Sequence, residues 1–135
     1  MTLRQQLHAT CVSRDGAGVL LVGAPGSGKS DLALRLLSRG FALVADDRVD
    51  VEDGMAQAPP ELAGLLEVRG LGIVRLPYAA EARLALVAEL EQPARLPQPA
   101  RDADLGLPII RVAPFAASAP DCVALALDCA LGSVV

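Results

Sequence analysis

Aromatic residues are scarce in this chain of 135 residues, which has two Phe, one Tyr and no Trp. The composition is 53% hydrophobic, so the core must be built from aliphatic side chains rather than from a few large rings. The net charge is -4, and few rings are available to stack on bases. Proteins that bind nucleic acid usually carry a basic patch, and many carry stacking aromatics. We therefore expect no nucleic-acid partner.

Long apolar runs and a cysteine framework are also missing. No run approaches the roughly 20 apolar residues that span a bilayer, and residues 1–6 lack the apolar core of a signal peptide. We expect a cytoplasmic protein with no membrane partner. Cys11, Cys122 and Cys129 are odd in number and show no CxxC spacing, which disfavours disulfides and a zinc site. We expect buried thiols.

Lysine occurs once among twelve basic residues, and that lysine lies in a motif. The segment from Gly23 to Ser30 matches G-x-x-x-x-G-K-S, the phosphate-binding loop. Glycines let backbone N–H groups wrap around a polyphosphate at the start of a helix. Lys29 can then bridge the outer phosphates, and Ser30 can hold Mg²⁺. The predicted phosphate-binding residues are Gly23, Ala24, Pro25, Gly26, Ser27, Gly28, Lys29 and Ser30.

The hydrophobic pattern predicts one α/β domain over residues 1–135 with a mixed sheet. Strands are expected at 7–12, 19–22, 41–45, 49–51, 55–58, 72–76, 83–90 and 107–112. Helices are expected at 30–39 and 120–131, with a brief one that begins at 59–61 and buries Leu62, Leu65 and Leu66. Asp15-Gly16 is a turn signal, so the first two strands form an antiparallel hairpin. Three prolines between residues 92 and 100 predict a loop or lid.

Two acids follow the apolar run of residues 41–45. Asp46 and Asp47 come at the carboxyl end of a predicted buried strand. A strand that ends in an acid beside a phosphate-binding loop is a common way to reach Mg²⁺. A polar strand end that caps the next turn is the alternative.

Two segments, in order, resemble the catalytic core of the HPr kinase/phosphorylase family. Residues 18–51 hold the loop and the two acids, and residues 58–73 include Leu-Glu-Val-Arg-Gly-Leu-Gly-Ile, which looks like that family's second signature. The resemblance extends from about Leu7 to Val74 and is weak beyond. It implies a short form with the catalytic C-terminal domain only, and a P-loop fold of the phosphoenolpyruvate carboxykinase type.

The resemblance also implies a reaction. A kinase of this family transfers phosphate from ATP or pyrophosphate, with Mg²⁺, to a serine of the phosphocarrier HPr, and can reverse the reaction by phosphorolysis. Asp46 would take the proton from the acceptor serine. Ser30 and Glu67 would bind the metal ion, with Asp47 in support. The family forms hexamers, so a homo-oligomer is expected.

Two further residues are assigned by resemblance alone. His8, the sole histidine, matches a family histidine on the strand before the loop strand, and Arg95 matches a family arginine that neutralises phosphate. A structural histidine and a solvated loop arginine are the alternatives, as is a surface ion pair for Glu67 and Arg69. Because the family's substrate-docking elements are reduced here, a small-molecule P-loop kinase and a non-catalytic nucleotide-sensing module stay open.

Overall fold

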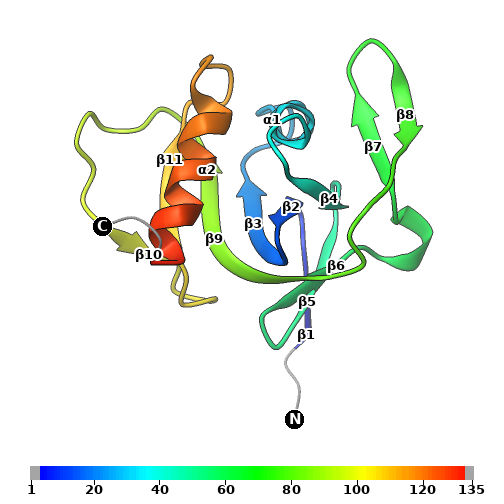
Figure 1. Cartoon of the computed structure of the whole chain (residues 1–135), viewed down its shortest axis with the longest axis horizontal. Coiled ribbons are helices and arrows are strands. Elements are labelled where there is room, and N and C mark those ends of the chain that lie inside the picture. The colour runs from blue at the N-terminus through cyan, green and yellow to red at the C-terminus, as the bar shows by residue number, and fades with distance from the viewer. Residues whose placement is uncertain (1–3, 133–135) are drawn as a thin grey trace.

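The structure, a computed structural model, describes residues 4–132. Within these residues it is a mixed α/β fold with a nine-stranded mixed sheet, a separate two-stranded sheet and two α-helices (Figure 1). The strands are β1 (Arg4–Leu7), β2 (Thr10–Arg14), β3 (Ala17–Val22), β4 (Ala42–Ala45), β5 (Val49–Glu52), β6 (Met55–Gln57), β7 (Leu65–Val68), β8 (Gly72–Arg75), β9 (Ala82–Leu90), β10 (Ala100–Arg101) and β11 (Pro108–Val112). The helices are α1 (Lys29–Leu37), α2 (Ala119–Ala130) and a short 3-10 helix, η1 (Pro60–Leu62).

The large sheet is organised around β9. Its order is β1-β5-β6-β9-β3-β2-β4, with β11 also paired to β9 and β10 paired to β11. The pairs β3–β9 and β11–β9 are parallel, and the other pairs are antiparallel. The predicted hairpin of β2 and β3 is confirmed, with Thr10 opposite Leu21 and Arg14 opposite Ala17. The sheet is therefore mixed, as expected.

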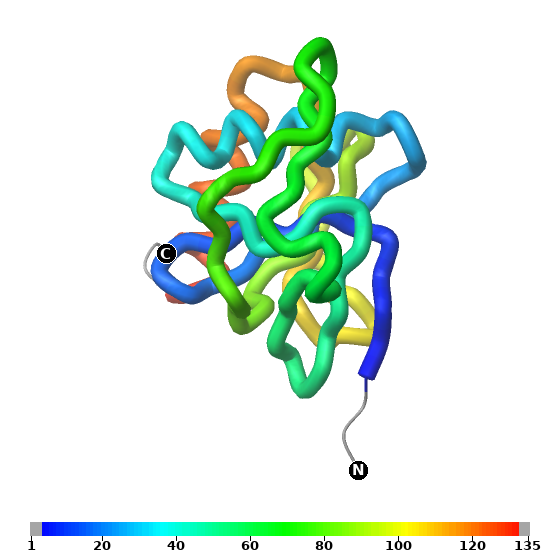
Figure 2. Tube along the Cα trace, turned by 90° about the vertical axis from the view of Figure 1, so that its right-hand side faces the viewer, coloured from blue at the N-terminus to red at the C-terminus, as the bar shows by residue number. Residues whose placement is uncertain are grey.

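Each face of the large sheet carries its own apolar core. On one face, α1 buries Leu32 and Leu36, and α2 buries Val123 and Leu127; both pairs have the i, i+4 spacing of one helical face. The opposite core contains Cys11, whose pKa burial raises from 9.0 to about 12, because a thiolate there would lose its hydration. Figure 2 shows α1 and α2 packed along the sheet. Neither helix within residues 4–132 is long and apolar enough to cross a membrane.

The predicted brief helix near residue 60 was wrong in extent. Only η1 forms, and Leu65 and Leu66 belong to β7, which pairs with β8 in the separate sheet. Gly64 lies between them at φ 77°, and a Cβ there would come within 2.9 Å of the Tyr78 ring. This left-handed residue stops the helix and directs the chain into the β7–β8 hairpin, which projects beyond the large sheet (Figure 1).

Two smaller expectations also failed. The apolar run 7–12 is broken at His8-Ala9, because β1 pairs with β5 whereas β2 pairs with β3 and β4. Cys11 is buried as expected, but Cys122 and Cys129 are exposed. Both lie on the outward side of α2, whose inward positions are taken by the larger aliphatic side chains named above.

Candidate functional site

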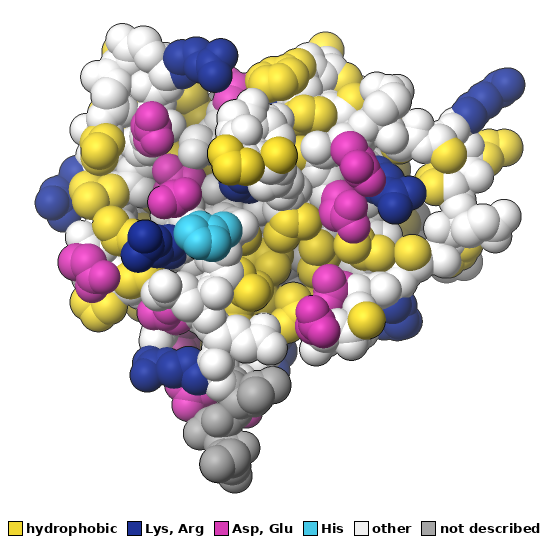
Figure 3. Space-filling view, turned by 180° about the vertical axis from the view of Figure 1, so that it is seen from behind, with side chains coloured by type: hydrophobic (Ala, Val, Ile, Leu, Met, Phe, Trp, Pro, Cys, Tyr) yellow, Lys and Arg dark blue, Asp and Glu magenta, His cyan; other side chains and the backbone are white. Residues whose placement is uncertain are grey.

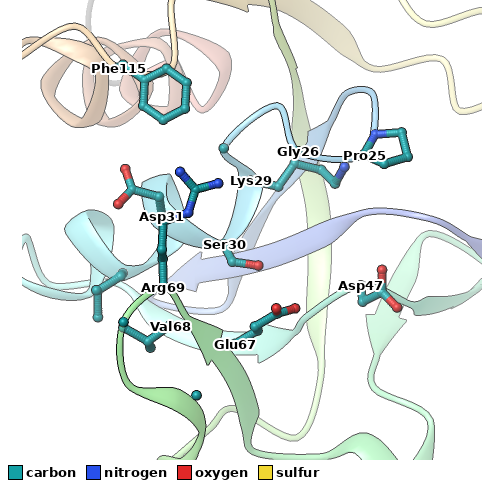
Figure 4. Close-up of a pocket in the computed structure, with 14 residues that line it drawn as sticks. Pro25, Gly26, Lys29, Ser30, Asp31, Asp47, Glu67, Val68, Arg69 and Phe115 are labelled. Atoms are coloured by element: carbon teal, nitrogen blue, oxygen red, sulfur yellow. The ribbon is translucent and has the colours of Figure 1, made fainter.

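A cavity of about 590 Å³ lies beside the glycine-rich loop, residues 23–28, which connects β3 to α1. Its walls come from that loop, the first turn of α1, Asp47 after β4, the β7–β8 hairpin and Phe115 before α2 (Figure 4). Cavities of a few hundred to about 1,000 Å³ are typical of small-ligand sites. The loop motif and the second signature thus form opposite walls of one cavity.

Backbone geometry explains why the loop needs glycine. Gly26 and Gly28 have φ of 80° and 103°, values that other residues rarely adopt. At Gly23 the reason is space, because an added Cβ would lie 2.5 Å from the Ser27 Oγ. Lys29 Nζ donates to the carbonyl oxygens of Gly23, at 2.8 Å, and Ala24, at 3.2 Å. The single lysine is therefore held over the loop, beside the cavity.

Asp46 joins the two motifs. Its side chain is buried and accepts three hydrogen bonds: Thr10 Oγ1 (2.9 Å) and Ser30 Oγ (2.7 Å) donate to Oδ1, and the Glu67 backbone N–H (3.1 Å) donates to Oδ2. These donors come from β2, α1 and β7. Asp46 is thereby fixed beneath the floor of the cavity, and it positions the hydroxyl of Ser30 and the backbone at Glu67.

Asp47 and Glu67 are placed differently from Asp46. Asp47 has φ 69°, and the Arg48 N–H donates to the Asp46 carbonyl oxygen at 2.8 Å, so the chain turns sharply where β4 ends. As a result Asp47 is exposed and lines the cavity while Asp46 stays buried. The Glu67 side chain also lines the cavity (Figure 4). Two acids with solvent access thus face the same space as Ser30.

These oxygen donors suit Mg²⁺ shared with a phosphate better than a metal held by protein alone. Among residues 4–132, no three His, Cys, Asp or Glu side chains form a metal-binding group. Mg²⁺, however, commonly uses one or two carboxylates plus substrate phosphates and water. Ser30, Asp47 and Glu67 meet that requirement, since a hydroxyl and two carboxylates line one cavity.

The structure does not bring His8 or Arg95 to this cavity. His8 is exposed at the bend between β1 and β2 and lines a second cavity of about 170 Å³, together with Asp102 and Asp104. The histidine is visible at the surface in Figure 3. Arg95 is exposed in the segment between β9 and β10 and lines neither cavity. Their proposed roles stay predictions.

Sequence reasoning missed three contributors to the site. Thr10 is an acceptor's partner two residues after His8, and no motif marks it. Asp31 lines the cavity from the first turn of α1. Phe115 reaches the cavity from the turn before α2, and the scarcity of aromatic residues was the available signal for it. Arg69, weighed as a surface ion-pair residue, lines the cavity too, and its guanidinium points toward α1 in Figure 4.

Comparison with known proteins gives consistent matches. The family model "HPr Serine kinase C-terminal domain" matches residues 1–92. An HPr kinase/phosphorylase of Lacticaseibacillus casei is 50% identical over 76 residues, which cover 53% of this chain and 24% of that protein. HPr kinase/phosphorylase 1 of Oceanobacillus iheyensis is 39% identical over 97 residues, covering 63% and 31%.

A solved structure extends the likeness to nearly the whole chain. The Hpr(Ser) kinase/phosphatase from Coxiella burnetii superposes with a TM-score of 0.76 and 25% identity, covering 96% of this chain and 92% of that chain. By contrast, the chain spans about a quarter of the length of the Lacticaseibacillus relative. The fold match therefore includes the region beyond residue 92, which the family model leaves unmatched.

Proposed function

The chain belongs to the HPr serine kinase C-terminal domain family, and from this premise we propose that it is an ATP-dependent protein-serine kinase acting on an HPr-like phosphocarrier. Its carrier would belong to a phosphotransferase regulatory system. Pyrophosphate is the alternative donor, and Mg²⁺ the expected metal ion. This proposal joins the family likeness to the chemistry of the cavity beside the glycine-rich loop.

One observation carries the proposal: a single buried carboxylate connects the two motifs. Asp46 accepts from Ser30 Oγ at 2.7 Å and from the Glu67 N–H at 3.1 Å. Phosphoryl transfer depends mainly on positioning and on neutralising charge, with one base near the acceptor hydroxyl. A carboxylate fixed between the loop serine and the signature glutamate supplies the base and orients both neighbours.

Each residue then has a distinct task. Bound with Mg²⁺, ATP supplies the phosphoryl group and a metal ion that neutralises its charge. Lys29 exchanges its hydrogen bonds to the Gly23 and Ala24 carbonyls for phosphate oxygens, and the loop N–H groups bind the polyphosphate. Ser30, Glu67 and Asp47 hold the metal ion, and Asp46 receives the proton of the acceptor serine.

Several finer expectations accompany this proposal. We expect a P-loop fold of the phosphoenolpyruvate carboxykinase type, one domain over residues 1–135, action in the cytoplasm and a homo-oligomer. The same groups would serve the reverse, phosphorolytic direction with inorganic phosphate. His8 and Arg95 would act on the phosphoryl group only if the segments that carry them move toward the cavity.

The test is phosphate transfer from labelled ATP with Mg²⁺ to the cognate HPr-like carrier. We expect serine-linked label with the native chain and a loss of about 100-fold or more in Asp46→Asn, as for removal of a general base. Asp15→Asn is the matched control, because Asp15 is an exposed turn residue on the hairpin of β2 and β3. It should transfer label at the native rate.

The outcomes separate the alternatives. No label on the carrier, with no difference between the native chain and Asp46→Asn, would reject the kinase. ATP turnover that needs no carrier would indicate a small-molecule kinase. Saturable nucleotide binding without transfer to any acceptor would indicate a nucleotide-sensing module.

A further inference from the structure

Phe115 is an exposed aromatic ring at the edge of the cavity. It is one of two Phe in the chain, and 66% of it is accessible to solvent. It lies in the turn between β11 and α2, beyond the residues that the family model matches. Leaving a large apolar ring in water forgoes the favourable free energy of its burial. An exposed ring in a cavity wall therefore suggests that a ligand covers it.

The turn that carries Phe115 is fastened to α1. Arg35 donates to the carbonyl oxygens of Pro114 and Ala116, the two neighbours of Phe115, the second at 3.2 Å. Arg35 Nε also donates to Asp31 Oδ2 at 3.1 Å, which holds the guanidinium in place. The backbone on both sides of the ring is thus tied to the helix that follows the glycine-rich loop.

The ring itself packs against that loop. A Cβ built on Gly28 would lie 2.9 Å from Phe115 Cζ, so only glycine leaves room for the ring there. Leu34, which is 37% exposed, lines the cavity as well. Figure 4 shows Phe115 on one side of the loop, well away from Asp47 and Glu67. The cavity therefore has an acidic end and an apolar end.

These two ends fit the two halves of a nucleotide. A triphosphate bound by the loop and Lys29 lies between them, with its metal ion toward Ser30, Asp47 and Glu67. The remaining part of the ligand then has the apolar end to occupy. A phenyl ring offers no hydrogen bond, so it recognises the face of a flat group rather than its edge.

We propose that Phe115 is a stacking platform for the nucleobase of the donor nucleotide, held ready by Arg35. The inference rests on the proposed function and adds the part of the donor that the glycine-rich loop does not bind. A phosphate chain without a nucleoside gains nothing from this ring. Phe115 then determines how much more tightly the site holds ATP than it holds an inorganic polyphosphate.

The experiment compares two ligands that share a triphosphate. Calorimetric titration of Mg·ATP and Mg·tripolyphosphate is done with the native chain, Phe115→Ala and Phe115→Tyr. Stacking on an aromatic side chain is worth about 1–3 kcal/mol per base, so Phe115→Ala should weaken ATP binding by about tenfold. Tripolyphosphate affinity should stay at the native value, and Phe115→Tyr should restore ATP binding. Leu125→Ala, an exposed residue of α2 outside the cavity, is the control.

A second readout uses the absence of tryptophan from the chain. Phe115→Trp introduces a single indole fluorophore at the proposed platform. Its emission should change on addition of Mg·ATP and stay constant with Mg·tripolyphosphate, even though both ligands bind.

Three results would overturn the inference. Equal ATP affinity in Phe115→Ala and the native chain would show that the ring contacts no base. Equal loss of both ligands would mean that the ring only supports the loop. If the native chain bound neither ligand, the proposed function itself would fall, and that outcome is distinct from the other two.

Discussion

Residues 4–75 and residues 76–132 contribute to this molecule in different ways. The first region supplies every residue that hydrogen-bonds to the Asp46 side chain, namely Thr10, Ser30 and Glu67. The second region supplies β9, which pairs with β3, β6 and β11, together with α2 and Phe115. The polar chemistry is thus concentrated where the sequence motifs lie. The scaffold, and the apolar end of the cavity, depend on a region without a motif.

This comparison predicts that the largest stability effect comes from the second region. Leu86 lies in β9, is 1% exposed and belongs to the core beneath the helices. Leu86→Ala should lower the free energy of unfolding by about 2–5 kcal/mol, because it removes buried methyl groups and leaves a cavity. Urea unfolding measures the change. Leu96→Ala, at an 85% exposed position, should change it by no more than about 0.5 kcal/mol.

If Leu86→Ala left unfolding unchanged, the motif region would fold without β9, and the two regions would be independent.

A smaller stability effect is expected at Asp46, in the first region. Asp46→Ala removes the acceptor for the hydroxyls of Thr10 and Ser30 and for the Glu67 N–H. A buried donor without a partner costs about 1–3 kcal/mol, so the free energy of unfolding should fall by about that amount. Asp46→Asn keeps a carbonyl acceptor of the same shape and should lose less. Native stability in Asp46→Ala would mean that the carboxylate does not join the two motifs.

The first region was also the more predictable from sequence. The Asp15-Gly16 turn and the alternating apolar residues predicted the β2–β3 hairpin, and the spacing of Leu32 and Leu36 predicted α1. The position of Asp46-Asp47 after an apolar run placed both acids near the loop. Local patterns were sufficient there because hairpin, loop and helix are contiguous in the chain.

The failures have a common physical cause. Leu62, Leu65 and Leu66 fit a helical face, but the left-handed Gly64 and the pairing of β7 with β8 override that spacing. The break at His8 depends on β5, more than 40 residues further along the chain. Phe115 enters the cavity only because Arg35 holds its turn against α1. Each outcome is decided by a contact between distant segments, which periodicity in one segment does not encode.

The central claim is that the glycine-rich loop, with Lys29 and the acids around Ser30, binds a metal-bound polyphosphate. Calorimetric titration with Mg·ATP, on the native chain and on Lys29→Ala, tests it most directly. We expect saturable binding to the native chain and a loss of about 10-fold to 100-fold in Lys29→Ala, because charge-assisted hydrogen bonds are worth about 1.5–3 kcal/mol each. Lys29 donates only to loop carbonyls, so the unfolding curve should not move. No saturable response from the native chain, or equal affinity in the variant, would contradict the account.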